Sequence, residues 1–477
     1  MFVGGISHFP QLLDWLQLAE RELLLFAAFW FIVSAVDELA VDCIWAWLRV
    51  RRPRTPRLPR GIETKALSGR AAVLVPAWHE SEVIGQMIAH ALKSWSQQGM
   101  MLYIGCYRND PMTIAAAMAG AKGDPRVRLV VNERAGPTTK ADCLNRLYAA
   151  LVADEARSGI PYSSIILHDA EDMVHPAALT VMDHALTEVD FVQLPVRPEP
   201  QPGSPWIAGH YTDEFTEAHA KTMIVRDALR TAIPAAGVGC GFARATLARF
   251  AALRMAEGGT GPFASECLTE DYELGVLVYR SGCKSRFLRL RDSDGELVAT
   301  RAFFPAALDV SVRQKARWIH GIALQGWDRL GWSRRPLDMW MTLRDRHGPL
   351  TAMVLAAAYL LLFLEGGLWV ARLLGWQTVV PSSPLLHTML AISFAGFVWR
   401  AIWRFGFTTR EYGPVEGARS VIRIPVANLI AILAGRRALF AYIRTLRGEL
   451  IRWEKTEHNA HPASSGGASS AARMLAR

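Results

Sequence analysis

The feature that most limits how this chain can fold is the position of its long apolar segments. They form two groups, at residues 23–48 and 350–399, and residues 70–330 between them contain no apolar run long enough to cross a membrane. A membrane-spanning helix needs about 20 predominantly apolar residues. The sequence therefore predicts one large water-soluble domain inserted between membrane segments.

The first apolar run, residues 23–36, would form a helix of only about 21 Å, shorter than a hydrocarbon core of about 30 Å. To span, the helix must include acidic neighbours, either at 20–22 or Asp37, Glu38 and Asp42. Because carboxylates are costly in lipid, these acids are expected to face other parts of the protein. A helix on the membrane surface is the alternative.

Arginines beside the apolar segments predict the topology. Residues 49–60 hold six arginines and three prolines, which indicates an extended linker on the cytoplasmic side. The connection 375–384 is uncharged, whereas arginines precede residue 350 and follow residue 399, so 350–371 and 379–399 are expected to form a hairpin with an outward tip. Residues 421–443 are interrupted by arginines, a proline and an asparagine, which favours a helix lying in the interface.

The chain is thus expected to have six parts. They are a membrane helix at 1–48, a basic linker at 49–69, a soluble domain at 70–330, an interfacial helix plus hairpin at 331–410, interfacial helices at 411–460 and a disordered tail at 461–477. The net charge of +9 could suit nucleic acid, but the arginines cluster beside apolar segments. We therefore expect contact with membrane lipids and no nucleic acid. The six scattered cysteines are typical of reduced cytosolic thiols, and no cleavable signal peptide is expected.

Within residues 70–330, short β-rich runs alternate with helical patterns, which predicts an α/β domain with a mostly parallel sheet. Strands are expected at 71–75, 101–105, 128–131 and 164–168, and helices at 81–94 and 140–153. In open α/β sheets, ligands bind beyond the carboxyl ends of the strands. The polar residues that follow these strands are therefore candidates for chemistry.

The first candidate is His168-Asp-Ala-Glu-Asp172, directly after a predicted strand. Two carboxylates one residue apart can share one divalent cation, and Mg²⁺ or Mn²⁺ prefers oxygen ligands and bridges to substrate phosphates. A solvated acidic turn is the alternative.

Two further candidates follow along the chain. In Thr269-Glu270-Asp271 an aspartate could accept the proton of an attacking hydroxyl, or the three residues could simply begin a helix. Gln314, Arg317 and Trp318 share one helix face, which suits sugar stacking and diphosphate binding. An ordinary interfacial helix is the alternative for this last motif.

In this order the motifs resemble the processive members of glycosyltransferase family 2, the GT-A-fold synthases of cellulose, hyaluronan and related polymers. Pro76-Ala-Trp-His-Glu80, Lys140-Ala-Asp-Cys-Leu-Asn145 and Gly237-Val-Gly-Cys-Gly-Phe242 look like that family's P-A-Y-N-E, K-A-x-x-L-N and acceptor-loop motifs. Residues 107–111, 168–172 and 453–458 are similar to a phage-adsorption group of inner-membrane proteins within the family.

The resemblance implies a Rossmann-like GT-A domain inserted between transmembrane helices, on the cytoplasmic side of a bacterial inner membrane. It implies inverting transfer of a sugar from a nucleotide-sugar, such as a UDP-sugar, to a growing cell-surface or exopolysaccharide chain or another carbohydrate or lipid-linked acceptor. It also implies an outer-membrane export partner and a phage-receptor role. Longer members carry a C-terminal cyclic-di-GMP-binding domain, and this chain stops where that domain would begin.

The family's functional residues map onto this sequence position by position. The catalytic residues would be Asp271 and Glu270; the donor-binding residues Glu80, Asn109, Asp110, Lys140 and Asp169; the acceptor-binding residues Gly239, Cys240, Gly241, Gln314, Arg317 and Trp318; and the ligands of Mg²⁺ or Mn²⁺ Asp169, Glu171 and Asp172. The sequence departs from the family by having Glu171 where a second aspartate is usual, and Asp172 could replace it.

Two other functions fit the sequence. About three spans are few for threading a long polymer, so a transferase that adds one sugar to a polyprenyl phosphate or glycolipid is the first alternative. A scaffold or receptor without catalysis is the second. The presence together of Asp169, Asp271, Gln314, Arg317 and Trp318 argues against a scaffold, which needs none of them.

Overall fold

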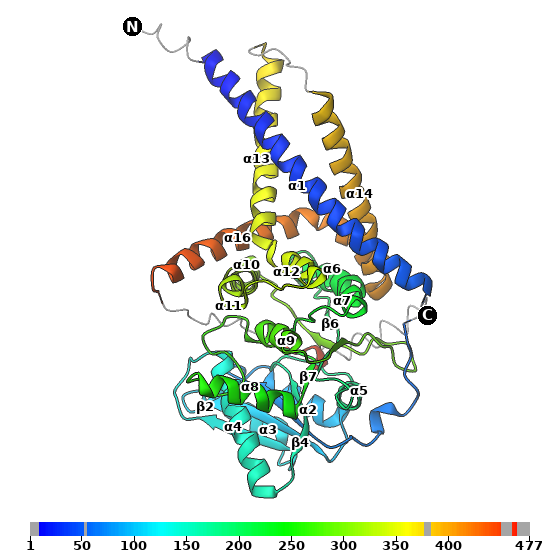
Figure 1. Cartoon of the computed structure of the whole chain (residues 1–477), viewed down its shortest axis with the longest axis vertical. Coiled ribbons are helices and arrows are strands. Elements are labelled where there is room, and N and C mark those ends of the chain that lie inside the picture. The colour runs from blue at the N-terminus through cyan, green and yellow to red at the C-terminus, as the bar shows by residue number, and fades with distance from the viewer. Residues whose placement is uncertain (1–8, 52–54, 376–382, 450–459, 465–477) are drawn as a thin grey trace.

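The computed structural model describes residues 9–51, 55–375, 383–449 and 460–464, with side chains from residue 15 onward. An α/β domain forms one end of the molecule, and three long helices project from it (Figure 1). These helices are α1 (Phe9–Arg51), α13 (Gly348–Leu373) and α14 (Pro384–Tyr412). A fourth, α16 (Ile424–Leu446), runs across their base, between them and the α/β domain (Figure 1).

A seven-stranded sheet in the order β3-β2-β1-β4-β7-β5-β8 forms the centre of the α/β domain. Its strands are β1 (Arg70–Pro76), β2 (Met100–Tyr107), β3 (Val127–Asn132), β4 (Tyr162–Leu167), β5 (Phe191–Gln193), β7 (Cys240–Ala243) and β8 (Ser285–Phe287). Strands β1 to β4 are parallel, as predicted, and β7 is antiparallel to both β4 and β5. A separate pair joins β6 (Val196–Pro198) to β9 (Thr300–Ala302).

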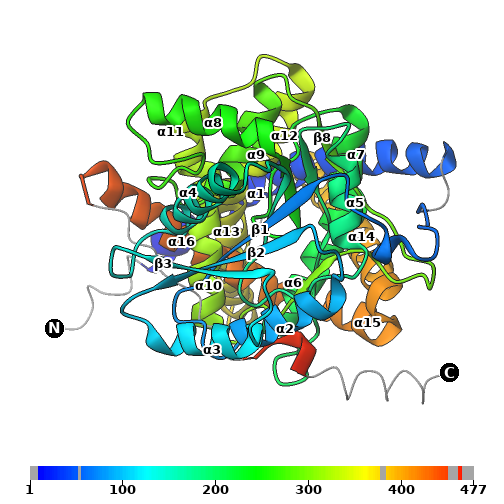
Figure 2. The same cartoon turned by 90° about the horizontal axis from the view of Figure 1, so that it is seen from below.

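Helices cover both faces of the sheet, with α2 and α3 on one side and α4 and α8 on the other (Figure 2). Alternate residues of β1 enter two separate cores: Val73 packs with one set of helices and Leu74 with the other, as the period of two in a strand requires. The helices of this part are α2 (Ile84–Ser94), α3 (Pro111–Ala121), α4 (Lys140–Ser158), α5 (Ala178–Ala185), α6 (Ile207–Glu217), α7 (Met223–Leu229), α8 (Arg244–Ala256), α9 (Glu270–Arg280), α10 (Leu308–Trp318), α11 (Gly326–Leu330), α12 (Pro336–Arg346) and α15 (Pro414–Ile422). Two short π-helical segments, η2 (Ala218–Thr222) and η3 (Ile319–Gln325), continue α6 and α10.

Among the residues that the structure describes, four helices are long and apolar enough to cross a membrane by length and composition: α1, α13, α14 and α16. Their directions differ, because α16 runs across the base of the three projecting helices (Figure 1). Most of the predicted interfacial segment 421–443 lies in α16, and α13 and α14 are the two helices of the predicted hairpin, whose placement in a membrane stays a prediction. The hairpin tip, 376–382, lies outside the described residues.

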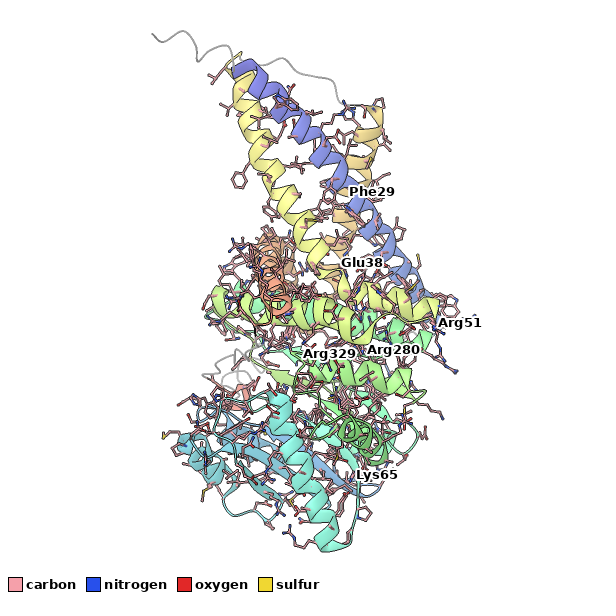
Figure 3. The ribbon with its side chains drawn as sticks, turned by 60° about the vertical axis from the view of Figure 1, so that its left-hand side comes forward. Phe29, Glu38, Arg51, Lys65, Arg280 and Arg329 are labelled. Atoms are coloured by element: carbon pink, nitrogen blue, oxygen red, sulfur yellow. The ribbon has the colours of Figure 1, made fainter. Side chains whose placement is uncertain are left out.

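The acids near the middle of α1 face protein, as the sequence required. Glu38 lies where the projecting helices meet the domain (Figure 3) and accepts hydrogen bonds from Lys221 and Arg400. Asp42 accepts from Lys221 at 2.7 Å, and Asp37 accepts from the Trp340 indole at 2.6 Å. The charges of Glu38 and Asp42 are compensated by Lys221 and Arg400, and that of Asp37 by Arg344.

One predicted boundary is wrong. The tail was expected to be disordered from residue 461, but residues 462–464 form a short helical turn, η4 (Pro462–Ser464), that packs against α2. His461 is fully buried and contacts the backbone of Asp172. The Ser, Gly and Ala content of residues 461–477 is typical of a disordered tail, and no sequence pattern marked His461 as a buried residue.

Candidate functional site

A cavity of about 740 Å³ opens beyond the carboxyl ends of β1 and β4, the edge at which the sequence placed the chemistry. Its wall combines the ends of these strands, the start of α4, the start of α9, the end of α10 and the end of α16. Ten of the predicted site residues line it: Glu80, Lys140, Asp169, Glu171, Asp172, Glu270, Asp271, Gln314, Arg317 and Trp318.

The acidic turn after β4 is held in place by its own last residue. The Asp172 carboxylate accepts hydrogen bonds at one oxygen, Oδ2, from the backbone N–H of Asp169 at 3.0 Å and from Nδ1 of His168 at 2.7 Å. Both His168 and Asp172 are buried, whereas Asp169 is partly exposed in the cavity wall. The turn therefore presents Asp169 and Glu171 to the cavity, while Asp172 uses part of its carboxylate to fix their backbone.

Lys140 lies opposite this turn, at the first position of α4. A capping box, in which Thr139 and Asp142 bond each other's backbone N–H groups, fixes the start of that helix. The Lys140 Nζ atom is 2.6 Å from Asp169 Oδ1. Burial lowers the pKa of Lys140, but the charges of Asp169 and the two acids of α9 outweigh burial and raise that pKa above its usual value. The ammonium group is therefore charged.

The third element of the cavity is the start of α9, where Glu270 and Asp271 stand next to each other. Burial and the adjacent Asp271 charge raise the pKa of Glu270 to about 8. Burial also raises the pKa of Asp271, although Lys140 opposes this shift. A Cβ at Gly237 would collide with Asp271 Oδ2, so only glycine, here at φ +72°, lets the loop approach this carboxylate. Asp271 is the more exposed of the two acids toward the cavity.

The segment η3 holds the loop that precedes α9. The Gln325 side chain accepts a hydrogen bond from the N–H of Leu268 at 3.0 Å and donates one to the carbonyl of Glu266 at 3.0 Å. Gly321 packs against the Thr269 side chain so closely that a Cβ there would displace it. Short π-helical turns inside helices occur often at functional sites, and this one joins the end of α10 to the loop that leads into α9. Sequence reasoning missed Gln325, for which no motif gave a signal.

Aromatic rings form the wall around Trp318. Phe215 of α6 lies 6.2 Å from Trp318 and 5.0 Å from Phe304, measured between ring centroids. All three rings line the cavity, together with Gln314 and Arg317. Flat apolar faces beside hydrogen-bonding groups suit a sugar ring, which has apolar and hydroxylated surfaces. Phe215 and Phe304 were not predicted, because they lie far from any motif.

The structure does not bring five predicted residues into the cavity wall. Asn109 exchanges two hydrogen bonds with the backbone of Gly136, and Asp110 caps α3 and accepts from the N–H of His79 at 2.6 Å. Of the three acceptor-loop residues, Gly239 directly precedes β7, and Cys240 and Gly241 lie in that strand. The cavity is lined instead by residues just before them, namely Pro234, Ala235, Ala236 and Val238. Short polar side chains are strong turn formers, and that use accounts for Asn109 and Asp110.

Trp78 is the main donor-side residue that the sequence analysis did not single out. It lines the cavity with Glu80, and its ring lies 4.9 Å from that of Tyr107. A Cβ at Gly136 would collide with the Trp78 ring, so Asn109 acts on the cavity indirectly by holding Gly136 beneath that ring. Its position within Pro76-Ala-Trp-His-Glu80 was the available signal.

The acidic residues of the cavity could supply some of the ligands of a divalent cation, with the other ligands coming from a substrate. Among the described residues, no three His, Cys, Asp or Glu side chains are grouped to hold a metal ion by themselves. Mg²⁺ typically binds one or two carboxylates and completes its shell with water and substrate phosphates. Asp169 and Glu171 supply such oxygens in the cavity, whereas Asp172 has committed one oxygen to the turn.

The chain resembles known proteins over most of its length. Residues 69–321, more than half of the chain, match the family model described as "Glycosyltransferase like family 2". The chain is 31% identical over 456 residues to Bacteriophage adsorption protein B of Escherichia coli (strain K12) and to Bacteriophage N4 adsorption protein B of Escherichia coli O157:H7. Each match covers 90% of this chain, which spans 60% of the length of these curated relatives.

Solved structures with a distant similarity include two glycosyltransferases. The mannosyltransferase PcManGT from Pyrobaculum calidifontis, in complex with GDP-Man and Mn²⁺, is 15% identical with a TM-score of 0.47, covering 85% of this chain and 99% of that one. The glucosyl-3-phosphoglycerate synthase from Mycobacterium tuberculosis, in complex with Mn²⁺, UDP and glucosyl-3-phosphoglycerate, is 16% identical with a TM-score of 0.31, covering 52% and 76%. The family match over more than half of the chain shows that the chain belongs to glycosyltransferase family 2, with an α/β domain inserted between apolar helices.

Proposed function

We propose that this protein is an inverting glycosyltransferase that moves a sugar from a nucleoside-diphosphate sugar, such as a UDP-sugar, to a growing cell-surface polysaccharide. One observation carries the proposal: Asp169, Asp271 and Trp318, which are distant in sequence, line one cavity. Each has a different chemistry, namely a cation ligand, a proton acceptor and a stacking surface. An anchoring scaffold would have no need to bring them together.

On the donor side, Lys140 and Asp169 face the position of the diphosphate. The Lys140 ammonium group would bind a phosphate oxygen, and Trp78 with Glu80 would flank the nucleoside. Asp169 and Glu171 would hold Mg²⁺ or Mn²⁺, which when bound supplies positive charge beside the departing diphosphate. The carboxylates themselves keep the donor in one orientation, so that its anomeric carbon points toward α9.

On the acceptor side, Asp271 would remove the proton of the attacking hydroxyl. Attack from the face opposite the leaving group inverts the anomeric carbon, and the aspartate must be ionised when this happens. Trp318, Phe215 and Phe304 would stack against acceptor sugars, while Gln314 and Arg317 would bond their hydroxyls or the diphosphate. Glu270, whose pKa is raised to about 8, would remain protonated at neutral pH and leave the single charge to its neighbour.

The proposed location is the cytoplasmic face of a bacterial inner membrane. The arginines that flank α1, α13 and α14 at their domain ends support this orientation. Nucleotide-sugars are cytoplasmic metabolites, so a catalytic domain on that side would meet its donor directly.

The test is Asp271→Asn in the full-length protein reconstituted in lipid. Sugar transfer, measured as product formed and nucleotide released in the presence of Mn²⁺, should fall by about 10³-fold, because general-base catalysis contributes 10²–10⁴-fold. Binding of UDP with Mn²⁺, measured by calorimetry, should stay within about threefold of the unmutated protein. Transfer at the unmutated rate would remove Asp271 from this role.

A further inference from the structure

We propose that His461 is a positioning residue for the metal-binding turn, so that the segment following α16 sets the affinity of the site for its cation. This inference rests on the proposed metal-dependent transfer and adds to it a residue nearly 300 positions away from the turn. Residues 460–464 lie behind the turn rather than in the cavity, so His461 would act through Asp172 and not on the substrate.

The hydrogen bonds of His461 define its protonation and direction. Its Nδ1 atom accepts a hydrogen bond from the N–H of Ala463 at 3.1 Å, so the ring proton lies on Nε2. That Nε2–H donates to the backbone carbonyl of Asp172 at 3.1 Å. The imidazole is fully buried, with relative exposure of 0%, so water does not compete for this bond.

Asp172 connects His461 to the residues of the cavity wall through two hydrogen bonds. Its backbone carbonyl is held by His461, while its side chain holds the N–H of Asp169 at 3.0 Å. A displacement of Asp172 therefore moves the backbone of Asp169 and Glu171, the two residues that present carboxylates to the cavity. Groups behind metal ligands commonly orient them, and losing one typically weakens metal binding 10- to 100-fold.

The neighbouring contacts hold other parts of the same segment. His90 bonds the carbonyl of Val174 at 2.9 Å, and the Trp95 indole donates to the carbonyl of His175 at 3.1 Å. These bonds fasten α2 to the residues after the turn. The bond from His461 differs because it acts on the residue whose carboxylate closes the turn.

The same region of the chain reaches the cavity from a second side. Thr445 and Glu449, at the end of α16, line the cavity wall. Residues 450–459 lie outside the described residues, and the next described segment carries His461. The end of α16 thus lies in the wall of the site, and residue 461 contacts the back of its acidic turn.

The experiment compares three variants of the full-length protein in lipid. His461→Ala removes the hydrogen bond, and His461→Gln restores a donor at an equivalent position. His184→Ala is the control, because His184, in the last turn of α5, also bonds a backbone carbonyl through Nε2, that of Ala66 at 2.9 Å, and does not contact the acidic turn. Mn²⁺ binding in the presence of UDP is followed by electron paramagnetic resonance, alongside thermal unfolding and nucleotide release at varied Mn²⁺.

We expect His461→Ala to weaken Mn²⁺ binding about 10-fold and to raise the Mn²⁺ concentration for half-maximal activity equally. Because the imidazole is buried, its removal should also lower the unfolding temperature, and His461→Gln, which keeps most of the side-chain volume, separates the two effects. His461→Gln should recover to within about threefold, and His184→Ala should match the unmutated protein. Unchanged Mn²⁺ binding in His461→Ala would overturn the inference, as would failure of the unmutated protein to bind Mn²⁺. If Mn²⁺ binding weakens as expected but no variant transfers sugar, the proposed function fails and the positioning role stands.

Discussion

Two buried clusters, each centred on a lysine, differ in how their charges are balanced. In the junction cluster, where α1 meets the domain, Lys221 Nζ lies within 3.0 Å of Glu38, Asp42 and Glu217. Arg400 adds a second cation, 2.6 Å from both glutamates. Each of these three carboxylates contacts a cation, so the cluster ties α1 and α14 to the end of α6.

In the cavity cluster, formed by Lys140, Asp169, Glu270 and Asp271, acids outnumber the cation. Lys140 makes its ion pair with Asp169, and the pKa values of Glu270 and Asp271 are both raised. Uncompensated negative charge in a cavity attracts protons and metal ions. The comparison teaches that a buried lysine with carboxylates holds elements together where each carboxylate contacts a cation, and is a candidate for chemistry where acids with raised pKa values stand beside it.

Removing the central lysine of the junction cluster should have the largest effect on stability. Lys221 is 1% exposed, and Lys221→Met leaves buried carboxylates with less compensation, which typically costs about 3–5 kcal/mol. Thermal unfolding in lipid or detergent should shift downward by several degrees, while Mn²⁺ dependence stays unchanged. Lys284→Met, at an exposed position of the domain, is the control and should shift little. Equal shifts in the two variants would show that the junction cluster does not hold the helices.

The sequence predicted the environment of the acids in both clusters, but it did not predict which residues contact them. The acids of α1 were expected to face protein because lipid excludes them, and the strands leading to Asp169 followed from their β-rich runs. Their partners were not predictable, since Lys221 and Arg400 become neighbours of α1 only through tertiary packing. The antiparallel strand β7 and the support from Gln325 carry no local pattern, and His461 lay in a segment of low complexity.

Removing the lysine of the cavity cluster should instead change the pH dependence of catalysis. As the proposed general base, Asp271 would act only when ionised, so the transfer rate should rise with pH through its pKa, which burial places above the ordinary value for aspartate. Lys140 opposes that shift, so Lys140→Met should move the acidic limb of the kcat profile to higher pH, with a lower maximum. A limb that stays in place would mean that Lys140 does not influence the base. Lys284→Met again serves as the control.

The smallest effect is expected at Glu270, because a bound proton already neutralises this carboxyl group at pH 7. Glu270 lies beside Asp271, and a pKa of about 8 keeps it neutral at pH 7, because two adjacent buried carboxylates do not both ionise. Glu270→Gln preserves the shape and neutrality of that side chain, so kcat at pH 7 should change by less than about 10-fold, far less than for Asp271→Asn. Above pH 8 the variant should keep its rate, while the unmutated enzyme acquires a second negative charge next to its base. A loss as large as that of Asp271→Asn would mean that Glu270 acts as an anion, and the two acids would then have to share the work of the general base.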